Sequence, residues 1–94
     1  MKRRHQTHQE VMKEALRDPE FKKIWEAGRT RRKIAMLVME KRIKQRLTQE
    51  EFADKIGMKQ PSLARIESGN VMPSIYTLEK IAKATNTTVD FRFV

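Results

Sequence analysis

Apolar residues recur three or four positions apart along most of the chain, and this spacing predicts a mostly helical protein. A first helix is expected over about residues 8–17. A second helix begins after Asp18, which can cap it, with Pro19 at its first position, and ends at Gly28. The apolar side chains of these two helices are Val11, Met12, Ala15, Leu16, Phe21, Ile24 and Trp25.

Two further helices are expected to frame a central motif. One runs from about residue 30 to residue 45 or 46, with Ile34, Leu37 and Val38 facing inward and a basic outer face. The other runs from about residue 74 to residue 85, and Ser74 can cap it. Its apolar residues Leu78, Ile81 and Ala82 should close the core.

The segment between these helices has the spacing of a helix-turn-helix. Thr48 and Glu51 are three apart, as in a capping box, which places a helix start at Gln49. Ala53 is the small residue that two steeply crossing helices need, and Gly57 suits a left-handed turn. An ordinary helical hairpin is the alternative, but the joint spacing favours the helix-turn-helix. The residues expected inside are Phe52, Ile56, Met58, Leu63 and Ile66.

Composition fits one small basic domain with an appendage. The 94 residues support one modest core, and the longest apolar run, residues 34–39, is too short to span a membrane. The absence of cysteine is compatible with a cytoplasmic location. Of the net charge of +9, residues 30–66 carry +6, with 10 basic and 4 acidic side chains. A polyanion would bind there, although such a patch also suits acidic proteins and membrane surfaces.

The motif resembles the Cro/C1-type (Xre family) helix-turn-helix over about residues 33–90. The stretches that carry the resemblance are Arg42, residues 47–53, 56–57, 60–69, 73–74 and 77–82. It implies an all-α fold with a five-helix, lambda-repressor-like domain at residues 30–86. It also implies binding to double-stranded operator DNA, in which one helix holds phosphate and the next reads bases.

The resemblance assigns roles to individual residues. Arg65 could bind guanine and Gln60 adenine, whereas Pro61 offers only an apolar contact. Lys59 stands where the family usually has a serine or threonine as helix cap. Arg42 and Glu67 would form a structural pair. The residues expected to read bases are Gln60, Pro61, Ser62 and Arg65, and those expected to contact phosphate are Gln49, Lys59, Ser68, Asn70 and Lys44.

Two flanking segments extend beyond this domain. Residues 87–94 alternate apolar and polar, which predicts a short C-terminal β-strand. The chain offers it no second strand, so it should pair with a second copy or with a sheet of another protein. Residues 1–29 are not needed for a helix-turn-helix, yet they are rich in apolar side chains. They either pack on the core or form a helical arm that binds a partner.

The whole arrangement is similar to HigA-type antitoxins. These bind a RelE/HigB-like toxin, a messenger RNA endonuclease, and repress their own operon. The resemblance implies a homodimer whose arm holds the toxin. A stand-alone Cro/C1-type repressor and an adaptor with a degenerate helix-turn-helix are the alternatives. The residues expected to bind the toxin are Val11, Leu16, Phe21, Ile24 and Trp25.

No enzyme activity, cofactor or small-molecule ligand is expected. The sequence has no glycine-rich phosphate loop, and its carboxylates lack the apolar surroundings that raise a pKa for acid–base catalysis. His5 and His8 are three apart, but two histidines without a third ligand make a poor zinc site, so no metal is expected.

Overall fold

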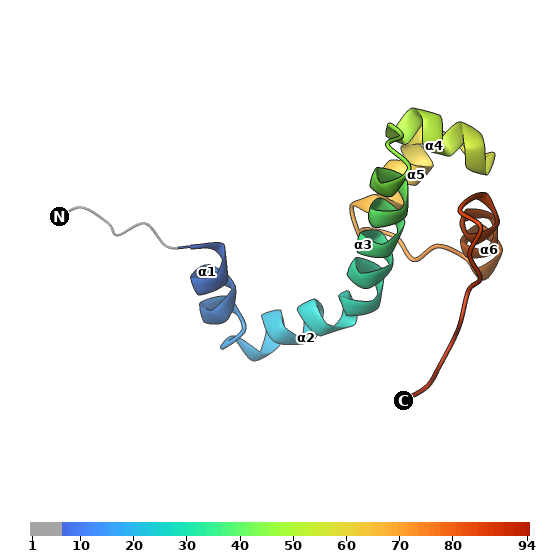
Figure 1. Cartoon of the computed structure of the whole chain (residues 1–94). Coiled ribbons are helices and arrows are strands. Elements are labelled where there is room, and N and C mark those ends of the chain that lie inside the picture. The colour runs from blue at the N-terminus through green and yellow to red at the C-terminus, as the bar shows by residue number, and fades with distance from the viewer. Residues whose placement is uncertain (1–6) are drawn as a thin grey trace.

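A computed structural model describes residues 7–94 of the chain, which form six α-helices. Helices α3 to α6 gather into a bundle, and α1 and α2 lead away from it (Figure 1). The described part of the arm is therefore mainly helical, and it projects from the domain. The helices are α1 (His8–Ala15), α2 (Pro19–Ala27), α3 (Arg29–Lys44), α4 (Gln49–Ile56), α5 (Gln60–Glu67) and α6 (Ile75–Ala84).

Local capping fixes the helix starts at the predicted positions. Asp18 accepts hydrogen bonds from the first turn of α2, and Ser74 accepts one from the first turn of α6. At α4 both bonds of the capping box form: Glu51 N–H donates to Thr48 Oγ1 (3.1 Å) and Thr48 N–H donates to Glu51 Oε1 (2.9 Å). The Thr48 backbone N–H, followed by its hydroxyl, lowers the pKa of Glu51. The carboxylate therefore stays charged at the positive end of the α4 dipole.

The core lies among α3, α4, α5 and α6. Phe52 and Leu63 are its two fully buried large side chains, and both were predicted. Leu37, which was predicted to face inward, is half exposed. It lies 100° around the helix from Val38, and the buried face of α3 is centred on Val38 and Ala35. The buried cluster is Val38, Phe52, Ala53, Ile56, Leu63, Ile66 and Ile81.

Two parts of the predicted fold class need correction. The domain has four helices, α3 to α6, rather than five, because the chain after α6 is extended. Residues 87–94 form no β-strand, since a strand needs a hydrogen-bonded neighbour and the described part of the chain has none. Thr87 N–H instead donates to Ala82 O (2.8 Å) and finishes α6. Beyond it, Phe93 and Val94 are fully exposed.

None of the helices within residues 7–94 is both long and apolar enough to cross a membrane.

Candidate nucleic-acid interface

A tight turn sets the angle between α4 and α5. Gly57 has φ 85° and ψ 40°, the left-handed conformation predicted for it. Its N–H and that of Met58 both donate to Ala53 O (2.9 Å each), which satisfies the carbonyl that α4 leaves unpaired. A side chain at position 57 would be strained at this φ. The turn therefore fixes the angle at which α5 crosses α4.

Helix α5 is anchored on one side and open on the other. Leu63 and Ile66 are buried against α3 and α4, and this orients the opposite side of the helix outward. Pro61 and Arg65 are exposed there, and Ser62 is half-buried. Lys59 is the N-cap but makes no side-chain capping bond, consistent with its departure from the usual capping residues.

An ion pair joins α3 to the end of α5. Arg42 Nε lies 2.9 Å from Glu67 Oε2, and Arg42 Nη2 donates to Glu67 Oε1 (3.1 Å). The remaining guanidinium nitrogen, Arg42 Nη1, donates to Leu47 O (2.9 Å). The Glu67 side chain is only 1% exposed and that of Arg42 17%. The predicted structural pair is present, and its bidentate geometry is what a buried carboxylate needs.

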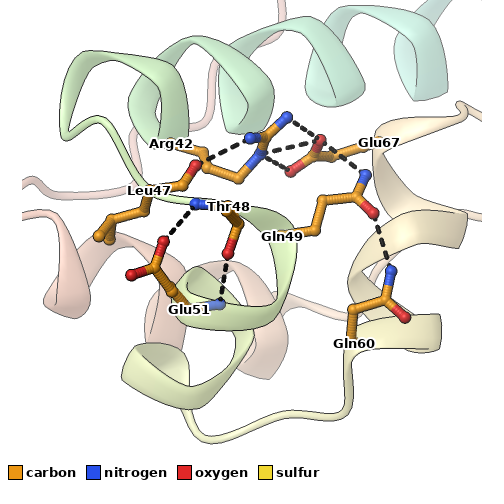
Figure 2. A network of polar contacts seen from close by, with 7 residues as sticks. All are labelled: Arg42, Leu47, Thr48, Gln49, Glu51, Gln60 and Glu67. Carbon is orange, nitrogen blue, oxygen red and sulfur yellow. Dashed lines mark hydrogen bonds and ion pairs between the residues drawn. The ribbon is translucent and has the colours of Figure 1, made fainter.

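The pair continues as a hydrogen-bond network to the start of α5 (Figure 2). Gln49 Nε2 donates to Glu67 Oε1 (3.1 Å), and Gln60 Nε2 donates to Gln49 Oε1 (2.9 Å). The carbonyl oxygen of Gln60 and its second N–H are not used in this network, and they are the two groups that pair with adenine N6 and N7. The network thus orients a candidate base-reading side chain before DNA arrives.

Sequence reasoning found these four residues but not their connection. It assigned Arg42 and Glu67 to structure, Gln49 to phosphate and Gln60 to bases, as separate roles. Gln49 and Gln60 are eleven positions apart on different helices, and no periodicity relates them. The one feature of the sequence that related Gln49 to Gln60 was that both belong to the helix-turn-helix motif.

Four of the five candidate phosphate contacts fall into two groups. Gln49 and Lys59 stand at the starts of α4 and α5, and Ser68 and Asn70 lie in the loop after α5. Ser68 Oγ donates to Arg65 O (2.7 Å) and accepts from Asn70 N–H (3.4 Å), which shapes this loop. Lys44 is elsewhere: two residues after Arg42, it projects from roughly the opposite side of α3.

The candidate toxin contacts lie on the arm, where no residue of α1 or α2 is buried. Val11 is 46% and Ile24 is 68% exposed, and Leu16 is half-buried. Phe21 stacks on Trp25, with ring centroids 6.4 Å apart. No residue of α1 or α2 belongs to the buried core cluster, although Trp25 contacts Arg32 at the start of α3.

Within residues 7–94 no group of three or more histidine, aspartate or glutamate side chains is placed to hold a metal ion. His8 belongs to this part, whereas His5 lies outside the described residues.

A family model described as Helix-turn-helix matches residues 38–91. The chain belongs to the helix-turn-helix family. The match covers the end of α3 and all of α4, α5 and α6. It includes every residue of the network and leaves the arm outside. Membership in this family supports DNA binding and a regulatory rather than an enzymatic role.

Two curated proteins are similar in sequence to the chain. The chain is 38% identical over 55 residues to the ImmF control region 10 kDa protein of Bacillus phage phi105, covering 58% of this chain and 61% of that protein. It is 43% identical over 42 residues to the plasmid copy control protein CopR of Streptococcus agalactiae, covering 45% and 46%. The chain thus spans about half of the length of these relatives. No solved structure gives a significant match.

Proposed function

We propose that this helix-turn-helix protein is a transcriptional repressor that binds an operator as a dimer in the cytoplasm. It would also be an antitoxin whose arm neutralises a RelE/HigB-like toxin. The observation that carries the DNA-reading part is the network from Glu67 through Gln49 to Gln60. It holds a glutamine amide at the first turn of the candidate recognition helix, where base-reading side chains of this motif act.

The charges of the surface support the same function. Arg65 is exposed on α5, one turn beyond Pro61 and Ser62, and can donate to guanine O6 and N7. Gln49 and Lys59 at the helix starts would bind the phosphates that flank those bases. The two control proteins that resemble the chain agree with a repressor role.

Arg65→Ala and Gln60→Ala should each cost about 1–3 kcal/mol of binding free energy on the cognate duplex. The duplex is first obtained by selection from a randomised library with the wild-type protein. Each variant should also lose discrimination at one base position, since each removes one bidentate contact. The measurement is fluorescence anisotropy at fixed salt. Lys83→Ala, an exposed position in the last turn of α6, is the control and should bind as the wild type does. If selection yields no sequence bound more tightly than random duplex, base reading is ruled out.

The antitoxin part of the proposal depends on the arm. Its exposed apolar side chains include Val11, Phe21 and Ile24, and none of its described residues belongs to the buried core of the domain. Apolar and aromatic groups presented this way are typical of a protein interface. Residues 1–29 carry 8 basic and 5 acidic side chains, so a basic RNA-binding partner would have to contact the carboxylates among them, which include Glu10, Asp18, Glu20 and Glu26.

The double variant Val11→Glu/Ile24→Glu should abolish recovery of a small basic partner when the chain is purified after co-expression with the neighbouring gene. Both side chains are exposed, so the domain should still fold and bind the selected duplex as before. Ile75→Glu, exposed on α6, is the control for adding a charge at an exposed apolar site. If the wild type yields no partner, the stand-alone repressor is the correct interpretation; if the double variant retains the partner, the arm is not the binding surface.

A further inference from the structure

Two arginines converge on the corner between α2 and α3. A Cβ atom on Gly28 would lie 2.7 Å from Arg32 Nη1 and 3.2 Å from Arg31 Nη2, so both guanidinium groups reach the same buried glycine. Within residues 7–94, the ion pairs Arg42–Glu67 and Arg92–Asp90 include neither of them. Two cations thus face one another across the corner without a carboxylate between them.

The two arginines differ in how they are held. Arg32 is fixed: its guanidinium lies 3.5 Å from the centroid of the Trp25 ring, and its Nη2 donates to Trp25 O. Arg31 is not fixed in this way, because its Nε is buried and has no hydrogen-bond partner. A buried N–H of a charged group without an acceptor is costly. If Arg31 turned outward, an anion at the corner would supply the acceptor that its Nε lacks.

The corner lies beside the candidate DNA-binding loop. A Cβ atom on Gly69 would lie 3.4 Å from Arg32 Cγ and 3.6 Å from Arg32 Cα. Gly69 stands between Ser68 and Asn70, the expected phosphate contacts at the end of α5. The start of α3 therefore lies against the loop that holds these two candidate phosphate contacts.

We infer that the Gly28 corner binds a phosphate of the DNA backbone, at the edge of the sequence that α5 reads. Arg31 supplies the main contact, and Arg32, held by Trp25, supplies the second. The inference rests on the proposed DNA binding and extends its footprint. It requires no base recognition, so the contact would act equally on any duplex.

The test measures how duplex affinity depends on salt concentration, on both the selected duplex and a random-sequence duplex. Each phosphate contact releases bound cations, so losing one lowers the slope of log affinity against log salt by about one. Arg31→Gln should lower the slope by about one on both duplexes. Lys83→Gln removes the same charge far from the corner and should leave the slope unchanged. The thermal midpoint of Arg31→Gln should not fall, because the buried Nε has no hydrogen-bond partner to lose.

A second variant separates a local site from general charge. Gly28→Ala keeps every charge, and its φ of −88° suits alanine, but the new methyl would displace Arg32 Nη1 from the corner. It should weaken binding to both duplexes. The inference is overturned if Arg31→Gln matches Lys83→Gln, or if Gly28→Ala binds as the wild type does. Base reading is judged separately, by preference for the selected duplex, so the inference can fail while the proposed function stands. If the wild type binds no duplex, both fail.

Discussion

Arg42→Met should lower the free energy of unfolding by about 3–5 kcal/mol, measured by urea denaturation followed by circular dichroism. The Glu67 side chain is 1% exposed, and Arg42 donates three of the hydrogen bonds that it accepts. Methionine fills much of the same volume but leaves the carboxylate buried without a cation. The remaining donor, Gln49 Nε2, is neutral and cannot replace the charge. Leu47 O also loses its guanidinium partner, which loosens the entry to α4.

The matched double variant Arg42→Met/Glu67→Leu tests this reason. With both charges gone, nothing charged stays buried, so most of the lost stability should return. Binding to the selected duplex should stay weak, because Gln49 has lost its acceptor on Glu67 and no longer holds Gln60. A double variant as unstable as the single one would show that shape, rather than an uncompensated charge, accounts for the loss.

Gln49 connects the buried ion pair to Gln60, the side chain proposed to read bases. Its carbonyl accepts from Gln60 and one of its amide hydrogens goes to Glu67, so only the second hydrogen is free for a phosphate. The Gln49 side chain would therefore contact the DNA backbone and also orient the base-reading amide of Gln60. This coupling explains why a buried ion pair is useful in a small domain, where an apolar pair would be about as stable.

Much of the domain follows from local rules in the sequence. The box of Thr48 and Glu51, the left-handed Gly57 and the buried Phe52 and Leu63 could be predicted because each depends on a few neighbours or on helical period. The pairing of Arg42 with Glu67 came from resemblance instead. Their separation of 25 positions has no local signature.

The features that the sequence did not reveal depend on the third dimension or on other molecules. Residues 87–94 alternate apolar and polar as a β-strand does. The described part of the chain offers no second strand to pair with them, so they form no strand. Leu37 was predicted to face inward, but it is turned 100° around α3 from the buried Val38, which is one residue further along. The convergence of Arg31 and Arg32 on Gly28 depends on the angle between α2 and α3, which no spacing encodes.

Phe52→Ala should also cost about 3–5 kcal/mol of unfolding free energy, because Phe52 is fully buried between α4 and the rest of the core. Domains are commonly stable by only about 5–15 kcal/mol, and a small one lies toward the lower end. A large part of the variant should therefore be unfolded at growth temperature, and duplex binding should fall although no DNA-facing side chain has changed.

The control for this change is Phe93→Ala, which removes the same ring from a fully exposed position. It should alter the stability by no more than about 0.5 kcal/mol. Equal urea midpoints for the two variants would contradict the placement of Phe52 at the centre of the core. If Phe52→Ala alone unfolds early, excess selected duplex should raise its midpoint, because DNA binds only the folded state. That recovery would show that the reading surface of α5 is intact and that the core keeps it assembled.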